Sequence, residues 1–317
     1  VGQVRSGTVS TESAGTPSAS AAQTIAAGYA VEGQALDLGS VVVDGTVDPS
    51  AQIRIPLATV NRHGLVAGAT GTGKTKTLQV MAEQLSAAGV PVLMADVKGD
   101  LSGLSRTGET NDKVTQRAAD TGDSWAPSAF PVEFLSLGTT GRGVPVRATI
   151  SSFGPILLSK VLGLNQTQES TLGLIFHWAD QKGLPLLDLK DLRSVIQFLT
   201  SDEGKPELKN LGAVSATTAG VILRALVNLE ADGGDTFFGE PELKPEDIMR
   251  VAGGRGVITL LEIGEQAARP VMFSTFLMWV LADLFTFLPE VGDLDKPKLV
   301  FFFDEAHLLF RDASKDF

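Results

Sequence analysis

The strongest structural signal in the chain is the stretch Gly64-Leu-Val-Ala-Gly-Ala-Thr-Gly-Thr-Gly-Lys-Thr75. From Gly68 onward it has the pattern G-x-x-x-x-G-K-T of a phosphate-binding loop, in which glycines let backbone N–H groups converge on phosphate oxygens. Lys74 then reaches the β- and γ-phosphates, and the Thr75 hydroxyl can ligate Mg²⁺. The helix that begins here directs its positive dipole end toward the anion. The residues predicted to contact a nucleotide are Gly68, Ala69, Thr70, Gly71, Thr72, Gly73, Lys74, Thr75 and Lys76.

The sequence on both sides of the loop supports this interpretation. Gly64-Leu-Val-Ala67 is a short apolar run, typical of a buried parallel strand. Apolar residues then recur at helical spacing until Gly89, a natural C-terminal stop. The run from Pro91 to Ala95 predicts a second buried strand that ends at Asp96. The predicted order is therefore strand, glycine loop, helix, strand.

A pair of acidic residues near residue 304 supplies the other half of a nucleotide site. Lys298-Leu-Val-Phe-Phe-Phe303 predicts a buried strand, and Asp304 and Glu305 follow it directly. At the carboxyl end of a strand beside the loop, Asp304 would hold Mg²⁺ through water and Glu305 would activate a hydrolytic water. We therefore predict Thr75 and Asp304 as metal ligands, and Lys74 and Glu305 as catalytic residues. Because no Asn-Lys-x-Asp string for reading guanine occurs, the expected cofactors are ATP and Mg²⁺.

Three further polar residues lie next to these predicted strands. Asp96 and Lys98 follow the strand after the loop, and we expect them at the carboxyl edge of the sheet, facing the ligand crevice. A solvated turn with local ion pairing is the alternative for both. His307 is expected on the helix after the last strand, as an ordinary packed residue, with a coupling role as the alternative.

Composition shifts divide the rest of the chain. The N-terminal part is dominated by Ser, Thr, Ala and Gly, which bury too little apolar surface to order a segment. Asp44-Gly45 between β-branched runs favours a tight hairpin, and a helical period follows residue 151. Strands that alternate with helices predict an α/β core with a mostly parallel sheet covered on both faces. The predicted segments are a flexible lead-in (1–28), a small β-hairpin element (29–60), the core (61–150 and 251–317) and a helical insertion (151–250).

The overall composition excludes several classes of protein. The chain has no Cys and three His, so a disulfide framework is excluded and a Cys/His zinc site nearly so. Its 26 Lys and Arg stand against 37 Asp and Glu, so it cannot grip nucleic acid over its whole surface. No secretory signal opens the sequence, and we expect a cytoplasmic protein. The apolar stretch from Val271 to Leu288 contains Asp283, which favours a buried helix over a membrane span.

Several stretches together resemble the bacterial HerA-like ATPases of the HerA/FtsK class, and more narrowly the branch with a helicase HerA-like C-terminal domain. They are Asn61–Thr75, Asp96–Leu104, Leu186–Arg193, Phe238–Pro241 and Phe301–Phe310. The first and last are generic to P-loop ATPases, whereas the middle ones are more specific. The resemblance runs from about Leu36 to the end of the chain.

This resemblance implies a RecA-like ATPase core, a helical insertion and assembly into a ring, hexameric in the family, with movement of DNA through the ring as one activity. Lys74, Thr75, Asp304 and Glu305 match the family's phosphate, magnesium and catalytic positions. The family continues past the Asp-Glu motif with a polar sensor and arginines that act on a neighbour's nucleotide. The sequence stops at Phe317, so we expect this C-terminal part of the core to be missing.

Three functions therefore stay open. The first is an ATP-driven motor that acts on DNA. The second is a nucleotide-regulated scaffold or assembly ATPase that acts on a protein partner, which seven acidic and two basic residues between Asn228 and Arg250 would suit better than DNA. The third is a small-molecule kinase, which would need an Arg-rich lid, and this segment offers only Arg250.

Overall fold

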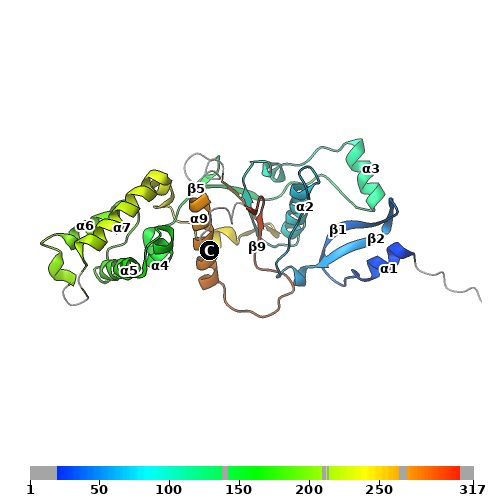
Figure 1. The fold of residues 1–317 in the computed structure, drawn as a ribbon. Coiled ribbons are helices and arrows are strands. Elements are labelled where there is room, and N and C mark those ends of the chain that lie inside the picture. Colours follow the sequence, from blue (N-terminus) through cyan, green and yellow to red (C-terminus); the bar gives the residue numbers. More distant parts are fainter. Residues whose placement is uncertain (1–19, 138–141, 209–211, 213, 264–269, 308–317) are drawn as a thin grey trace, which may run out of the picture. The chain divides into compact units, whose positions relative to one another are not determined.

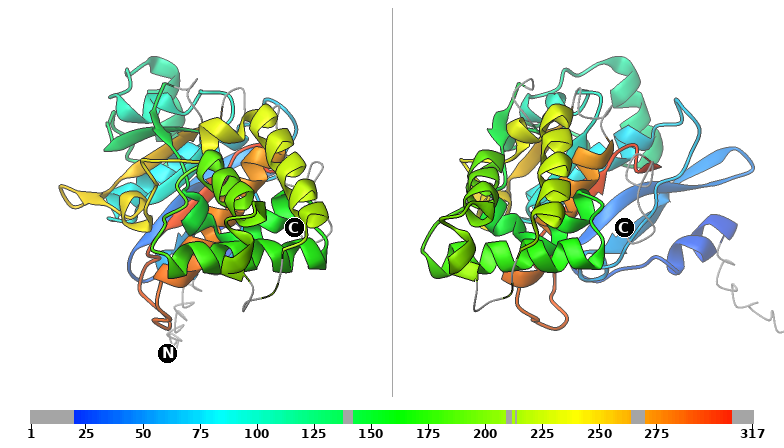
Figure 2. Two further views of the ribbon diagram at one scale, coloured as in Figure 1. Left: turned by 90° about the vertical axis from the view of Figure 1, so that its left-hand side faces the viewer. Right: turned by 60° about the vertical axis from the view of Figure 1, so that its left-hand side comes forward.

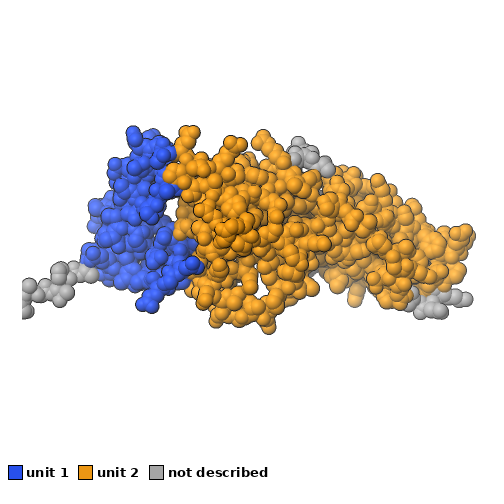
Figure 3. All heavy atoms as spheres, turned by 180° about the vertical axis from the view of Figure 1, so that it is seen from behind, with its two compact units in different colours: residues 1–56, 110–126 blue, residues 57–109, 127–317 orange. Residues whose placement is uncertain are grey.

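The computed structural model of the chain describes residues 20–137, 142–208, 212, 214–263 and 270–307. The chain divides into two compact units, coloured separately in Figure 3. Unit 1 takes the chain up to Pro56 and adds Thr110–Ala126. Unit 2 takes Leu57–Glu109 and everything from Pro127 onward.

A two-stranded antiparallel hairpin forms the centre of unit 1. Strand β1 (Ala35–Val43) pairs with β2 (Thr46–Pro56). Asp44 and Gly45 join them with φ angles of 50° and 78°. Two successive residues of positive φ give a hairpin turn whose twist matches that of the strands. The small β element predicted from Asp44-Gly45 is confirmed.

A short helix packs on this hairpin where the composition predicts a flexible lead-in up to residue 28. Helix α1 (Ala21–Ala27) begins with a capping box in which Ser20 and Gln23 bond to each other's backbone. Its residue Ala22 is buried against Val41 and Ala51 of the hairpin. Residues 20–28 are therefore ordered by a cap and a small apolar contact. Residues 1–19 of the expected lead-in lie outside the described residues.

Helix α3 (Asp112–Thr121) also belongs to unit 1. The carbonyl of Thr121 at its C-terminal end accepts hydrogen bonds from Ser40 Oγ at 2.5 Å and from Gln52 Nε2 at 2.9 Å. These bonds satisfy a helix-end carbonyl that has no partner within the helix. Residues 110–126 thus group with the hairpin, whereas the sequence places them with the 61–150 segment.

A five-stranded parallel sheet forms the centre of unit 2. Its spatial order is β5 (Val144–Val146), β4 (Val132–Leu137), β8 (Ile258–Glu262), β3 (Val92–Asp96) and β9 (Val300–Phe303). Every neighbouring pair is parallel. The carboxyl ends of all five strands therefore meet at one edge, which is where open α/β sheets bind ligands.

Helices cover both faces of this sheet, as predicted. Leu93 and Ala95 of β3 pack into one large apolar cluster, and the alternate residues Val92 and Met94, on the other face, are equally buried. Helices α2 (Lys74–Ala87) and α9 (Pro270–Phe287) lie on opposite sides of β9 in Figure 1.

The predicted helical segment between residues 151 and 250 is present as one group of helices, green to yellow in both views of Figure 2. Its helices are α4 (Ile150–Val161), α5 (Gln166–Gln181), α6 (Leu189–Thr200), α7 (Ala216–Leu229) and α8 (Asp235–Phe237). Phe153, Phe237 and Phe238 meet edge to face, and Phe276 of α9 joins them. The helical segment therefore shares one core with the sheet.

The remaining elements of unit 2 are short. They are the 3₁₀ turns η1 (Leu57–Thr59), η2 (Ser102–Ser105), η3 (Lys205–Leu208) and η5 (Pro245–Ile248), the π turn η4 (Glu230–Gly234), and the two-residue strands β6 (Val251–Ala252) and β7 (Arg255–Gly256).

One predicted strand is wrong. The apolar run Gly64–Ala67 before the glycine loop has no strand conformation, and Leu65 is 85% exposed. Among the described strands, none pairs with the 64–67 segment. A strand is defined by its ladder of hydrogen bonds to a neighbour, so an apolar run without one stays irregular.

The apolar stretch 271–288 forms α9, whose residues Thr275, Phe276 and Trp279 are buried in the protein core. Asp283 lies in the same helix. Nowhere in the described part of the chain is there a helix that is both long enough and apolar enough to span a membrane. The helix is thus a core element of unit 2, as expected.

Candidate functional site

The glycine loop leads directly into the N-terminus of α2. Gly71 and Gly73 have φ angles of 81° and 96°, where residues with a Cβ are strained. No side chain caps the helix at Gly73, so the first N–H groups of α2 have no side-chain partner at the cap. Uncapped N–H groups at a helix N-terminus form a ready anion site. The local structure therefore has the backbone geometry that phosphate binding requires.

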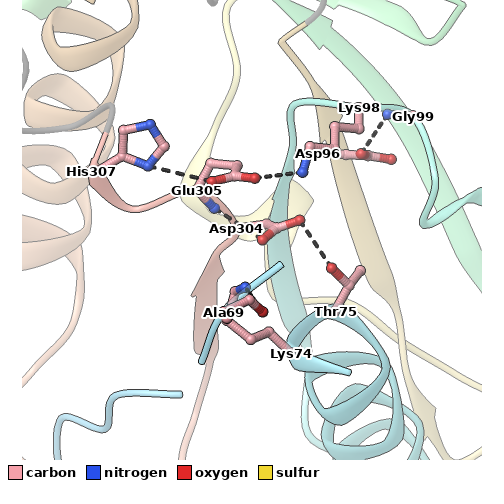
Figure 4. A network of polar contacts seen from close by, with 9 residues as sticks. All are labelled: Ala69, Lys74, Thr75, Asp96, Lys98, Gly99, Asp304, Glu305 and His307. Carbon is pink, nitrogen blue, oxygen red and sulfur yellow. Dashed lines mark hydrogen bonds and ion pairs between the residues drawn. The ribbon is translucent and has the colours of Figure 1, made fainter. Parts of the chain in front are cut away.

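Within the loop, the carbonyl of Ala69 is the common acceptor (Figure 4). It accepts from Lys74 Nζ at 3.0 Å and from Thr72 Oγ1 at 2.8 Å. Lys74 is thereby folded back over the loop. Its ammonium donates to the Ala69 carbonyl, and a phosphate oxygen would replace that carbonyl as the acceptor. Lys76 behaves differently, because its ammonium donates to Gln79 Oε1 at 2.8 Å, one turn further along α2.

The two motifs predicted from distant parts of the sequence meet. Thr75 Oγ1 donates to Asp304 Oδ2 at 3.5 Å, across 229 positions of the sequence. Asp304 directly follows β9, whereas Thr75 lies in the first turn of α2. The loop, the helix N-terminus and the acidic pair therefore surround one region at the carboxyl edge of the sheet.

The donor set at this meeting point fits Mg²⁺. A hydroxyl and a carboxylate are hard oxygen ligands, and Mg²⁺ is usually held by one or two such groups together with phosphates and water. The described residues contain no group of three or more His, Cys, Asp or Glu that could hold a metal by themselves. Thr75 and Asp304 thus suit an ion that arrives with a nucleotide, rather than a metal caged by protein alone.

Glu305 has an unusual backbone conformation and two basic neighbours. Its φ angle is 54°, and its N–H donates to Asp304 Oδ1 at 2.9 Å. Lys98 Nζ lies 2.5 Å from Oε1, and His307 Nδ1 lies 3.3 Å from Oε2 (Figure 4). The hydrogen bond from Lys98 lowers the pKa of Glu305, with smaller contributions from the charges of His307 and Lys74. Glu305 is therefore ionised at neutral pH, as a proton acceptor must be.

The prediction of His307 as an ordinary packed residue is wrong. Its side chain is 68% exposed, and its ring faces Glu305 instead of the protein core. The carboxylate lies only two residues earlier, at the turn after β9, so the imidazole reaches it without being buried.

Asp96 proves to be a structural brace and not a residue facing the ligand. It is 3% exposed, and its carboxylate accepts from the N–H of Gly99 at 2.7 Å and of Leu101 at 3.3 Å. Burial raises its pKa, and these two hydrogen bonds oppose that rise. The turn that Asp96 fixes is the one that carries Lys98, and Lys98 does face the site.

Sequence patterns assign no role to two groups that the structure places at this edge or beside it. Glu262 ends β8 and accepts from the backbone N–H of Arg142 at 2.6 Å. Gln79, nearly buried on α2, donates to the carbonyl of Asp100 at 3.3 Å and so ties the helix to the turn after β3. An acidic residue at the end of a predicted strand was the available signal for Glu262; nothing in the sequence marks Gln79.

Comparison with known proteins agrees with this geometry. A family model described as "Helicase HerA-like C-terminal" matches residues 43–317. No curated protein matches the chain. Among solved structures, the bacterial conjugative coupling protein TrwBdeltaN70 in its unbound monoclinic form has a TM-score of 0.50 at 16% identity, over 92% of this chain and 75% of that one. Its trigonal form with sulphate has a TM-score of 0.49 at 16% identity, over 91% and 74%. The first likeness confirms the predicted RecA-like α/β fold.

Proposed function

The chain belongs to the helicase HerA-like C-terminal family of P-loop ATPases, and on that basis we propose that it binds ATP with Mg²⁺ and hydrolyses it. The observation that carries the proposal is the contact between Thr75 and Asp304. It brings a phosphate-binding loop and an acidic pair to one place, and neither motif alone would specify hydrolysis.

Each residue has a defined part in the proposed reaction. Lys74 leaves the Ala69 carbonyl and binds the β- and γ-phosphates. Thr75 and Asp304 hold Mg²⁺, which supplies positive charge to the phosphates. A water attacks the γ-phosphorus, the bond to the β–γ bridging oxygen breaks, and ADP departs with that electron pair. Glu305 accepts the proton of the attacking water.

We propose that the same core drives movement along DNA in a ring of subunits, hexameric as in the family. The division into a nucleotide core (61–150 and 251–317) and a helical insertion (151–250) is part of this proposal. The acidic stretch Asn228–Arg250 favours a second candidate, an ATPase that acts on a protein partner, because seven acidic residues repel phosphate. One of the seven, Glu230, pairs with Arg193 within the helical segment.

Two substitutions test the nucleotide chemistry. Lys74→Ala removes a charged contact to phosphate and should weaken ATP and ADP binding by about tenfold or more in calorimetric titrations. Glu305→Gln should still bind ATP but lose about 10²–10⁴-fold in phosphate release. Lys190→Ala and Glu203→Gln remove the same charges at exposed positions of the helical segment and serve as controls. Undiminished turnover by Glu305→Gln would refute the catalytic assignment.

The polymer is tested separately. Phosphate release is measured with single- and double-stranded DNA at low and moderate salt, alongside the mass of the assembly. DNA stimulation that falls steeply with salt supports the motor, because phosphate contacts release counterions. A rate of phosphate release that no polynucleotide changes at low salt, and that a protein partner raises, supports the second candidate.

A further inference from the structure

Lys98 and Glu305 follow two neighbouring strands that end at the same edge of the sheet. β3 and β9 run parallel in register, with Ala95 opposite Phe303. Lys98 lies two residues after the end of β3, and Glu305 two residues after the end of β9. Parallel pairing therefore brings both side chains to the same edge of the sheet. Continued past the strands, this register places Glu305 level with Val97, one residue before Lys98, and the side chains of Lys98 and Glu305 form an ion pair at 2.5 Å.

The turn that carries Lys98 is built into the core. Asp96 accepts two backbone hydrogen bonds across it, from Gly99 and Leu101, and Leu101 is completely buried. Gly99 has a φ angle of 73°, which allows the chain to reverse there. Gln79 of α2 bonds to the carbonyl of Asp100 in the same turn. The turn is thus fixed to both β3 and the helix that follows the glycine loop.

The ammonium of Lys98 itself remains free to change partner. Its side chain is 56% exposed, whereas that of Glu305 is 28% exposed. Ion pairs that solvent reaches are weak, so a group of higher charge can displace the carboxylate. The γ-phosphate of ATP is such a group, and it would lie between Lys74, Thr75 and Glu305.

We propose that Lys98 is a γ-phosphate sensor: it holds Glu305 in the nucleotide-free and ADP-bound states, and moves to the terminal phosphate when ATP binds. This movement frees Oε1 of Glu305 to accept a proton from water. Hydrolysis removes the terminal phosphate, and Lys98 returns to Glu305. The inference rests on the proposed function, since it needs a nucleotide in this site, and it assigns Lys98 as a positioning residue for Glu305.

The decisive measurement uses Glu305→Gln as the parent, because its turnover is blocked and its partner charge is absent. Dissociation constants of ATP and ADP are measured for this parent and for the parent with Lys98→Met, Lys98→Arg or the exposed control Lys190→Met. Lys98→Met should weaken ATP binding by about tenfold, the size expected for one exposed charged contact. It should weaken ADP binding by less than about twofold. Lys98→Arg should retain most of the preference for ATP. Unchanged ADP binding also shows that the variant is folded.

Three results would overturn the proposal. If Lys98 only neutralises Glu305, then Lys98→Met has no effect on ATP in this parent. If Lys98 only supports the fold, Lys98→Met weakens the binding of ATP and of ADP equally. If neither the parent nor the wild-type chain binds a nucleotide, the proposed function itself fails and the sensor with it.

A second measurement follows the ion pair directly. A water-soluble carbodiimide converts the Glu305 carboxylate to an O-acylisourea, and the Lys98 amine attacks its acyl carbon, forms an amide and expels the urea, because Lys98 Nζ and Glu305 Oε1 are in contact. Mass spectrometry of the wild-type chain should find the 98–305 cross-link without nucleotide and with ADP, and at least fivefold less of it with a non-hydrolysable ATP analogue. Equal yields with ADP and the analogue would contradict the switch.

Discussion

Replacing Asp96 should destabilise unit 2 although the residue takes no part in the chemistry. Asp96→Ala leaves the N–H groups of Gly99 and Leu101 without their acceptor, and Leu101 is closed to water. A buried donor without a partner costs about 1–3 kcal/mol. Relief of the carboxylate's own burial offsets part of this cost, so we expect a net loss of about 1–2 kcal/mol. Asp96→Asn keeps one acceptor and should lose about half as much.

Denaturation with urea, followed by tryptophan fluorescence and circular dichroism, measures this loss. A domain of about this size loses roughly 2–4 °C in Tm for each kcal/mol, so Asp96→Ala should melt roughly 2–8 °C lower. Asp100→Asn removes the same charge from an exposed neighbouring position, and should change stability by less than about 0.5 kcal/mol. Equal midpoints for Asp96→Ala and Asp100→Asn would refute the role of Asp96 as a brace.

The pH dependence gives an independent check on Asp96. Because burial raises its pKa in the folded state, the folded protein binds this proton more readily than the unfolded chain. Its contribution to the free energy of unfolding is therefore full below the unfolded pKa of about 3.9, and is lost as pH rises through the higher folded pKa. The stability of the wild-type chain minus that of Asp96→Asn should fall over this interval. A difference that stays constant with pH would contradict the raised pKa.

Three further predictions concern the loop, the metal and the core. Gly73→Ala places a side chain at a φ of 96°, which costs about 1–3 kcal/mol, and should weaken ATP binding measured by calorimetry. The control Gly103→Ala adds a Cβ in open space and should leave ATP binding unchanged. Asp304→Asn should abolish the gain in ATP affinity that Mg²⁺ provides, as chelation does for the wild-type chain; an unchanged gain would remove Asp304 from the metal site. Phe276→Ala should cost about 3–5 kcal/mol in urea denaturation, because the ring is completely buried, whereas Phe285→Ala, 88% exposed, should cost almost nothing.

The parts of this molecule that local patterns determine could be predicted from the sequence. The hairpin at Asp44-Gly45 and the glycine loop before α2 both depend on backbone preferences of adjacent residues. The meeting of Thr75 with Asp304 was predictable for another reason: both motifs end or begin at the carboxyl edge of one parallel sheet. The parallel sheet therefore predicts this contact, although the two residues lie far apart in the sequence.

The parts that depend on distant partners could not be predicted. The 64–67 run has the apolar composition of a strand but pairs with no strand among the described residues, and its composition alone does not reveal this. Asp96 looks like a ligand-facing carboxylate until its burial is known. The position of α3 on the hairpin follows from bonds to its last carbonyl, which no local pattern encodes. Helix α1 could have been predicted, because Ser20 and Gln23 form the local pattern of a capping box. The Ser-, Thr-, Ala- and Gly-rich composition favoured a flexible segment instead.

The backbone conformation of Glu305 places the stability of the protein in conflict with the presence of a carboxylate at this position. A glutamate at a φ of 54° is strained by roughly 1–2 kcal/mol relative to glycine, so the most robust protein would carry glycine there. Such a protein would melt later and would have no carboxylate beside Lys98. Mutants selected only for thermal resistance should therefore accumulate Glu305→Gly or Glu305→Asn, whereas selection for the proposed ATP hydrolysis should retain glutamate at this position.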